Sequence, residues 1–498
     1  MAREPKSKDH KEQSLDPADW TEFRDLSHQM LDAALDHMQG ADERPVWTPI
    51  PEAVKSALAE PPPMRPQGTK KVCDDLTKLV LPYATGNTHP RFFGWVHGAG
   101  TPGAVIADTM AAAMNSNLGG RDHGAIYVER QVIDWCRKLF GFPDTASGLV
   151  VSGTSIATMI ALTTARFHKV DYDVRRRGVQ PSEGKLVGYA SSEAHSCMAR
   201  TFDLMGLGMD ALRSIPADDA YCMDIDALQD AIARDMAAGK TPFCVMGSAA
   251  TVNTGSIDDL AAIAAVCKEH DLWFHVDGAF GAIPALNDAL RPRLAGIELA
   301  DSIAFDFHKW MHVQYDAGFV LIRREDLHRE AFTLRREYLT AAPRGLAAGN
   351  PWFCEYGPEL SRGFRALKIW FALKEHGVEA IARKVEDNCR QAAYLKSLVE
   401  AHEHLELSAP VALNIVCFRY VAASRSDDEL NTINAEIVMD LQESGVAAPS
   451  TTKLADILAI RVNITNHRTR QSDMEVLVEA VVEAGRARAG QSDGVPES

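Results

Sequence analysis

The sequence lacks any uninterrupted apolar run of about 18 residues, the length that a membrane-spanning helix requires. It also lacks an excess of basic residues, since 52 lysines and arginines stand against 68 aspartates and glutamates, a formal net charge of −16. This balance argues against non-specific nucleic-acid binding and against an anionic membrane surface as a partner. Met1 to Gln13 is polar and charged with no apolar stretch behind it, so no secretory signal is expected.

Disulfide and metal motifs are lacking as well. The nine cysteines are scattered singly and form no Cys-x-x-Cys motif, which predicts reduced thiols in a cytoplasmic protein. His308 and His312 stand at helical spacing, but no glutamate accompanies them in the metalloprotease pattern. The sequence therefore predicts no metal site.

A chain of 498 residues exceeds the size of one hydrophobic core, so two or three domains are expected. Residues 1–92 predict a helical and extended N-terminal segment that is too thin to fold alone and should pack on something larger, such as another subunit. Residues 93–377 predict a large α/β domain, and residues 378–498 predict a small α+β domain.

In the large domain, short apolar strands alternate with helical segments. This alternation is typical of an α/β fold with a mostly parallel sheet that is covered on both faces. Ligands of such sheets bind at the carboxyl ends of the strands. The predicted strands are Gly148–Val151, Leu186–Ala190, Phe243–Gly247, Trp273–Val276, Ser302–Phe307 and Gly318–Ile322.

The strand at Ser302–Phe307 ends abruptly in the pair His308-Lys309. A lysine at the mouth of a buried strand is costly unless it is used or neutralised. One use is an imine, because a desolvated amine loses its proton readily and attacks carbonyl groups. Taken alone, the pair fits a solvated strand end better.

The first strand runs into Ser152-Gly153-Thr154-Ser155 at the start of a predicted helix. Free backbone N–H groups, the helix dipole and the hydroxyls make such a turn an anion site, although a simple helix cap explains it equally well. The turn has neither the lysine of a P-loop nor the full dinucleotide fingerprint. A phosphate therefore fits, whereas a nucleoside triphosphate does not.

Three further strand ends carry polar side chains. His195 follows the second strand and could stack on a planar ligand or donate a proton in catalysis, although a buried core histidine is the simpler explanation. Thr251 follows the third strand in a turn with other hydroxyls. Asp277 ends the fourth strand, where a buried carboxylate requires a cationic partner. Beside a pyridine ring, it would keep the ring nitrogen protonated.

Together, these strand ends offer an anion cradle, an imidazole, a hydroxyl, a carboxylate and an amine. Pyridoxal 5′-phosphate (PLP) requires this set, because it carries a phosphate, a flat ring, a phenolic oxygen, a ring nitrogen and an aldehyde. The cofactor acts as the electron sink, and the protein places and tunes it. The ordered set of residues therefore predicts PLP.

Six segments carry a resemblance to a known family: His89-Pro-Arg-Phe-Phe-Gly94, Ser152-Gly-Thr-Ser155, Ala194-His-Ser196, Trp273-Phe-His-Val-Asp-Gly-Ala279, Asp301 to Trp310, and Arg362-Gly-Phe-Arg-Ala-Leu-Lys-Ile-Trp370. The chain resembles the group II PLP-dependent decarboxylases of the aromatic-L-amino-acid decarboxylase type over nearly its whole length. The resemblance implies the fold-type I, aminotransferase-like architecture and an obligate homodimer with shared active sites. It also implies that an L-amino acid is converted to its amine and carbon dioxide.

The resemblance also assigns roles to residues. Lys309 would form the internal imine, Asp277 would pair with the pyridine nitrogen, and His195 would stack on the ring. Asp306 stands where the family usually has asparagine, and a carboxylate there would contact a phosphate directly only if protonated. The remaining contacts would come from Thr154, Ser155 and His308 to the phosphate and from Thr251 and Ala279 to the ring.

A loop tyrosine is the favoured proton donor in the animal members of this family. Alignment backwards from Arg362 puts Phe353 at that place, whereas a short gap restores Tyr356, which is then the candidate catalytic proton donor. Phenylalanine there resembles relatives that consume oxygen and release an aldehyde. The sequence leaves the choice between Phe353 and Tyr356 open.

The substrate side departs from the aromatic decarboxylases, because Asn87, His97, Asn117 and Gly119 replace bulky contacts while Trp95 stays aromatic. A smaller or more polar substrate, or another pose, would explain this; realigned loop residues would explain it equally well. Two alternatives to simple decarboxylation follow. One is an oxidative aldehyde synthase or another PLP lyase, and the other is an inactive binding homologue, against which the full set of cofactor residues argues.

Overall fold

The computed structural model describes residues 14–180, 185–334, 342–423 and 425–491. Contacts divide the chain into two units, of which the first runs up to Glu43 and resumes over Thr48–Thr85. The second comprises Arg44–Trp47 and the chain from Gly86 onward. Among the described helices, none is both long and apolar enough to cross a membrane.

The first unit is helical. Its longest helix, α1 (Trp20–Gln39), begins at Asp19, whose carboxylate accepts the first free backbone N–H groups of the helix. α2 (Glu52–Leu58) and α3 (Thr69–Asp75) follow, and a π-helical turn and a 3-10 turn extend α3 to Tyr83. Helices are therefore present in the part of the chain for which a helical and extended segment was predicted.

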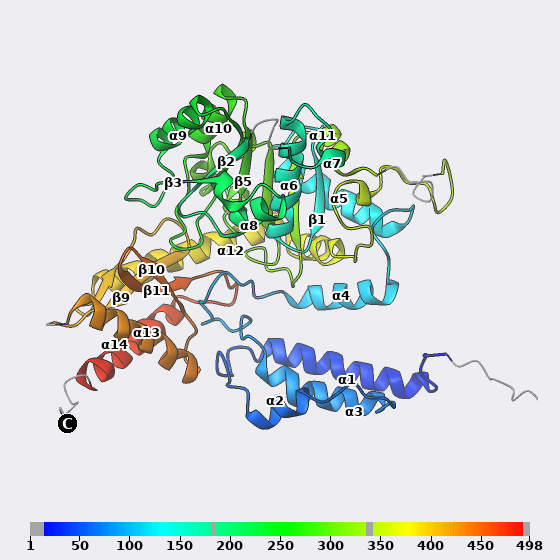
Figure 1. Ribbon diagram of the computed structural model, residues 1–498. Coiled ribbons are helices and arrows are strands. Elements are labelled where there is room, and N and C mark those ends of the chain that lie inside the picture. The colour runs from blue at the N-terminus through cyan, green and yellow to red at the C-terminus, as the bar shows by residue number, and fades with distance from the viewer. Residues whose placement is uncertain (1–13, 181–184, 335–341, 424, 492–498) are drawn as a thin grey trace, which may run out of the picture. The chain divides into compact units, whose positions relative to one another are not determined.

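The second unit is built on a seven-stranded sheet with the order β1-β7-β6-β5-β4-β2-β3. β7 runs antiparallel to its neighbours β1 and β6, and the remaining pairs are parallel. The predicted mostly parallel α/β sheet is thereby confirmed (Figure 1). The strands are β1 (Ser147–Val151), β2 (Lys185–Ser191), β3 (Leu212–Ile215), β4 (Lys240–Ser248), β5 (Trp273–Asp277), β6 (Ser302–Asp306) and β7 (Gly318–Ile322).

Helices cover both faces of this sheet, because every residue of β1, β5, β6 and β7 is buried. α6 (Thr154–Lys169) packs against β6 and β7, and α5 (Gly124–Leu139) packs against β1. The other helices of this part are α4 (Pro102–Met114), α7 (Val174–Arg177), α8 (Cys197–Leu204), α9 (Ile225–Ala237), α10 (Leu260–Glu269) and α11 (Glu325–Phe332).

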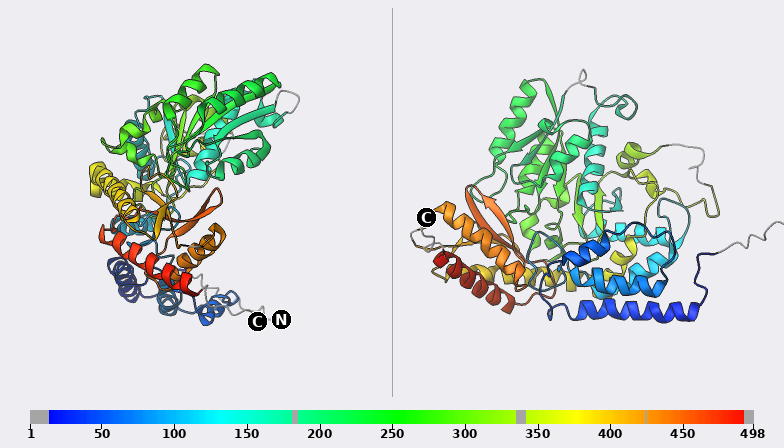
Figure 2. Two further views of the ribbon diagram at one scale, coloured as in Figure 1. Left: turned by 90° about the vertical axis from the view of Figure 1, so that its left-hand side faces the viewer. Right: turned by 60° about the horizontal axis from the view of Figure 1, so that its bottom comes forward.

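The C-terminal part begins within α12 (Ala366–Glu400), which is broken at Gly377, where φ is 74°. An antiparallel sheet of order β10-β11-β9-β8 follows, with α13 and α14 packed on it around a separate core (Figure 2). The predicted small α+β part is thus present, whereas domain boundaries at residues 92 and 377 remain a prediction. Its elements are β8 (Leu405–Leu407), β9 (Ile415–Tyr420), α13 (Asp427–Glu443), β10 (Ser450–Leu454), β11 (Ile457–Asn463) and α14 (Ser472–Gln491).

Candidate active site

The carboxyl ends of β1, β2, β4, β5 and β6 lie at one edge of the sheet, because these strands share one direction. A cavity of about 450 Å³ opens there. The structure brings eight sequence-predicted residues to the lining of this cavity. They are Thr154, Ser155, His195, Thr251, Asp277, Ala279, His308 and Lys309.

Lys309 follows directly after the turn at the end of β6. Its Nζ lies 3.0 Å from a carboxylate oxygen of Asp306, and the side chains are 22% and 3% exposed. The amine is partly buried, paired with a carboxylate and open to the cavity, so the aldehyde of a ligand bound in the cavity can reach it. This placement suits the predicted imine.

Asp277 is the last residue of β5 and is buried. Burial raises the pKa of its carboxyl, and the Ala279 N–H, which donates to Oδ1 at 3.1 Å, and the positive charge of Lys309 oppose the rise. Protein cations stabilise this buried carboxylate only weakly, so a cationic ring nitrogen beside it would stabilise it strongly.

His195 and Thr251 lie on the same lining. The Cys197 N–H donates to Nδ1 of His195 at 3.2 Å, which leaves Nε2 as the protonated nitrogen of the neutral ring. The Thr251 hydroxyl is 2.8 Å from the Ser256 hydroxyl, which donates to the Tyr221 carbonyl. These bonds fix both side chains before any ligand arrives.

The N-terminus of α6 forms the anion end of the cavity. The N-cap residue Gly153 provides no side-chain cap, and the Thr154 N–H donates to Asp306 Oδ1 at 2.7 Å. The Thr154 Oγ1 is buried and has no hydrogen-bond partner among the described residues. Gly318 of β7 must be glycine, because a Cβ there would lie 2.3 Å from the Gly153 Cα.

His308 lies beside this helix end. Its Nδ1 accepts the Ala317 N–H at 3.0 Å, and its ring packs on Tyr315 with 4.3 Å between centroids. Burial lowers the pKa of His308, and the Asp306 charge only partly offsets this. The neutral ring therefore carries its proton on Nε2, which can donate to a ligand.

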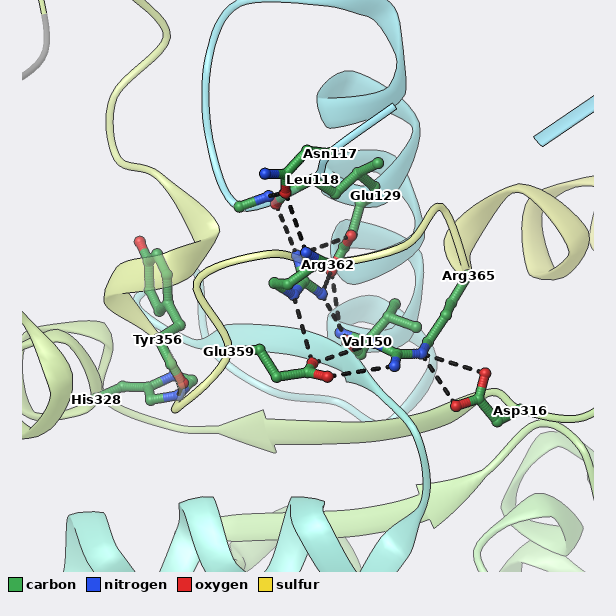
Figure 3. A network of polar contacts seen from close by, with 11 residues as sticks. Asn117, Leu118, Glu129, Val150, Asp316, His328, Tyr356, Glu359, Arg362 and Arg365 are labelled. Atoms are coloured by element: carbon green, nitrogen blue, oxygen red, sulfur yellow. Dashed lines mark hydrogen bonds and ion pairs between the residues drawn. The ribbon is translucent and has the colours of Figure 1, made fainter. Parts of the chain in front are cut away.

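Tyr356 is not brought to the cavity. It is buried, and its hydroxyl donates to Glu325. His328 Nε2 donates to its carbonyl at 2.7 Å, and Figure 3 shows these two residues side by side. Phe353 is also turned elsewhere, with the Arg362 guanidinium 5.1 Å from its ring centre. The two residues between which the sequence could not choose thus both pack in the protein interior.

The predicted substrate-side residues separate into two groups. Trp95 and His97 line the cavity, and their rings stack at 5.7 Å between centroids. Asn87 and Asn117 instead hold backbone groups, those of Gly98 and of Gly119 and Arg362, respectively. The cavity also contains Tyr315, which sequence reasoning missed; the only signal was an aromatic residue shortly after Lys309.

The residues present fit PLP. An orphaned Thr154 hydroxyl at a helix N-terminus suits its phosphate, Asp277 suits its ring nitrogen, and Lys309 suits its aldehyde, all in one cavity. The fold and the cavity therefore define a PLP-binding enzyme of aminotransferase-like architecture.

Comparison with known proteins narrows this class. The family model "Pyridoxal-dependent decarboxylase conserved domain" matches residues 51–421. An aromatic-L-amino-acid decarboxylase of Bacillus atrophaeus is 33% identical over 459 residues, which cover 91% of this chain and 93% of that protein. A phenylacetaldehyde synthase of Arabidopsis thaliana is 26% identical over 465 residues, covering 90% and 93%.

A solved structure, Oryza sativa TDC with PLP and tryptamine, superimposes with a TM-score of 0.86 at 23% identity. The match covers 95% of this chain and 99% of that one, which supports the fold. The chain belongs to the pyridoxal-dependent decarboxylase family. It is a PLP-dependent amino-acid decarboxylase, and PLP is its cofactor.

Proposed function

We propose that this enzyme decarboxylates an aromatic or related L-amino acid to its amine and that Lys309 binds the cofactor aldehyde. One observation carries the proposal: Lys309, Asp277 and the N-terminus of α6 open onto the same cavity. The aromatic class rests on the name of the Bacillus relative and on the aromatic rings of Trp95 and Tyr315 in the lining.

When bound, PLP supplies an aldehyde for a lysine amine and a ring that accepts the electron pair released with carbon dioxide. Asp277 would keep a proton on the ring nitrogen, because its buried carboxylate is stabilised by a neighbouring cation. His195 would cover one face of the ring, and Thr251 and Ala279 would line its edge. Thr154, Ser155 and His308 would donate to the phosphate.

The substrate side chain would lie against Trp95, His97 and Tyr315. His97 and Tyr315 meet edge to face at 6.1 Å between centroids. Burial lowers the pKa of His97, and the charge of Lys309 lowers it further. A neutral imidazole would offer a substrate hydroxyl or ring N–H a hydrogen bond without a charge, which favours a polar aromatic side chain.

The enzyme would act as a homodimer in the cytoplasm. Two exposed apolar stripes with four-residue spacing support the dimer, since such stripes mark helix faces that associate. All nine cysteines are free, which suits a reducing compartment. The stripes consist of Val72, Leu76 and Val80 and of Ile106, Met110 and Met114, each between 46% and 56% exposed.

Oxidative conversion to an aldehyde is the second candidate. One observation favours it: the Tyr356 hydroxyl is bound to Glu325 and is not part of the cavity lining. A proton donor of another kind would then have to serve decarboxylation, and His195 in the cavity lining is a candidate.

A panel of L-amino acids separates the two candidates when carbon dioxide, amine, aldehyde and oxygen are all quantified. We expect amine and carbon dioxide in equal amounts without oxygen uptake. Aldehyde that forms with oxygen uptake would establish the second candidate instead. A purified chain that binds PLP but releases no carbon dioxide from any member of the panel would contradict both.

A further inference from the structure

The middle of β5 carries a polar residue where an apolar one is expected. His275 is fully buried on a strand with parallel neighbours on both sides, and strands in that position are typically continuous apolar runs. Burial lowers the pKa of its imidazole to about 3, so the ring is neutral. A neutral polar side chain in such a place costs stability unless its hydrogen bonds are made. The partners of His275 therefore show what the residue does.

Two hydroxyls from different elements hold His275. Its Nδ1 lies 2.8 Å from Ser302 Oγ of β6, and its Nε2 lies 3.4 Å from Thr158 Oγ1 of α6. Both partners are fully buried, and Trp273 Nε1 donates to the same Ser302 Oγ at 2.7 Å. A hydroxyl can donate or accept, so both ring nitrogens are satisfied whichever of them carries the proton. The result is a buried polar chain that connects β5, β6 and α6.

This chain contains the one hydrogen bond between β5 and α6 in the part of the protein that the structure describes. β6 is joined to α6 separately, because the Thr154 N–H donates to Asp306 Oδ1 at 2.7 Å. The separation between β5 and α6 therefore depends on the contact of His275 with Thr158, together with the apolar packing of the helix on the sheet.

The next positions along the same two elements face the cavity. Asp277 lies two residues after His275, so the two side chains project from the same face of the sheet. Thr154 lies one turn before Thr158, so these two lie on the same side of α6. Asp277 and Thr154 both line the cavity. The gap between β5 and α6 is thus bridged by protein side chains at one level and is open to a ligand at the level above.

We propose that His275 is a positioning residue that sets the separation between β5 and α6, and that PLP spans this separation between its ring nitrogen and its phosphate. This role rests on the proposed function, which assigns Asp277 to the ring nitrogen and Thr154 to the phosphate. With the separation fixed, both ends of the cofactor are bound at once and little ordering is left to occur on binding. With the separation loosened, PLP must give up part of one contact, whereas a ligand with only one of the two ends can follow that end.

Three ligands test this difference. PLP has both ends, 1-deazapyridoxal 5′-phosphate lacks the ring nitrogen, and pyridoxal lacks the phosphate. The variant is Thr158→Val, which replaces the hydroxyl by a methyl group and keeps the shape of the side chain. Binding of each ligand to the full chain freed of cofactor is measured by titration calorimetry. We expect the variant to bind PLP about three- to tenfold more weakly, the effect of one lost hydrogen bond, and to bind the other two ligands as wild type does.

Ser302→Ala removes the second hydroxyl, and Ser147→Ala is its matched control. Ser147 Oγ likewise lies 2.8 Å from Nδ1 of a buried histidine, His328, and neither of these two residues lines the cavity. Both variants should lower the midpoint of urea denaturation. Only Ser302→Ala should lose affinity for PLP selectively and lower kcat at an unchanged KM, because Asp277 would then meet the ring nitrogen less closely.

Variants of His275 itself provide the conservative rescue. His275→Gln should keep more of the PLP affinity than His275→Leu, because the glutamine amide can still form a hydrogen bond with a hydroxyl of the chain, whereas leucine cannot. Equal losses in the two variants would contradict the role of the hydrogen bonds.

The remaining outcomes separate this role from the proposed function. Unchanged PLP affinity in Thr158→Val, an equal loss for all three ligands, or the same selective loss in Ser147→Ala would overturn the role of His275 and leave the PLP site intact. Wild type that binds PLP no more tightly than both one-ended ligands would show that Asp277 and Thr154 are wrongly assigned, and the role of His275 would fall with them.

Discussion

A buried ion pair behind the cofactor site offers the sharpest test of how this fold is held together. Glu129 of α5 and Arg362 each have a side chain that is 1% exposed, and they contact one another (Figure 3). Glu129 Oε1 also accepts the Val150 N–H at 3.1 Å. Arg362 donates to the Leu118 carbonyl at 3.0 Å and to the Val150 carbonyl. We predict that Glu129→Ala is strongly destabilising.

The magnitude follows from what the substitution leaves behind. Removal of Glu129 takes away the acceptor of both Arg362 nitrogens Nη1 and Nη2 and of the Val150 N–H. The guanidinium stays buried with the Leu118 and Val150 carbonyls and the more distant Glu359 carboxylate, 4.0 Å from its Nε, as partners. Breaking a buried pair in this way costs about 3–5 kcal/mol. Replacing both residues together, by Glu129→Leu and Arg362→Met, should cost less, because no charge then remains buried.

Urea denaturation of the cofactor-free protein, followed by tryptophan fluorescence, measures the loss as a shift of midpoint at constant slope. Glu379→Ala is the control, because Glu379 pairs with Arg383 at 3.7 Å on the surface with side chains 94% and 66% exposed. It should leave the midpoint nearly unchanged. The same small shift for Glu129→Ala as for Glu379→Ala would refute the reasoning.

Three further predictions concern the site and the assembly. Lys309→Ala should lower turnover about a thousandfold or more while PLP still binds non-covalently, so that after borohydride reduction and denaturation the cofactor stays attached to wild type but is released from the variant; turnover near that of wild type would exclude the imine. Asp277→Ala should lower turnover by at least about a hundredfold and PLP affinity by less, as kcat and fluorescence titration will show; the reverse order would make Asp277 an anchor. Met110→Glu should convert dimers to monomers, as light scattering will show. Met236→Glu is the control, because Met236 is 54% exposed and Met110 is 53% exposed but Met236 lies outside the two apolar stripes, and it should leave the dimer intact; a dimer that persists in both variants would place the interface elsewhere.

Much of the fold could be predicted because most of its strands and helices correspond to local patterns of apolar residues in the sequence. The strands of the sheet are short buried apolar runs, and each one that was predicted is present. β3 was missed because it is a four-residue edge strand of which only Ile215 is buried, so it carries no continuous apolar run. α4 was missed because Ala, Gly and Pro dominate it and blur the helical period.

The candidate site could be located because residues at the carboxyl ends of parallel strands lie at the same edge of the sheet, whatever the conformation of the connecting loops. Contacts between distant segments could not be predicted in the same way. Asp306 and Thr154, or Arg362 and Glu129, are joined by bonds that leave no periodic pattern in the chain. The orientation of Tyr356 depends on such a bond too, since Glu325 lies in another element. Its placement away from the cavity therefore had no local signal.

The Glu129–Arg362 ion pair is connected to the cofactor site through the backbone of β1, so a change in the ion pair affects the stability of the cofactor-bound enzyme as well as that of the core. Arg362 and Glu129 hold the carbonyl and the N–H of Val150, and the anion-binding turn begins at Ser152, directly after β1. Cofactor binding stabilises only the folded state, by about 2.7 kcal/mol when free ligand is at a hundred times its Kd. In the cofactor-bound enzyme, removal of the ion pair would disturb the turn at Ser152 and would thus lower both the stability of the core and the stabilisation that the cofactor adds. The cost of the buried pair alone is therefore measured in the cofactor-free chain, because no ligand then adds to the stability of the folded state.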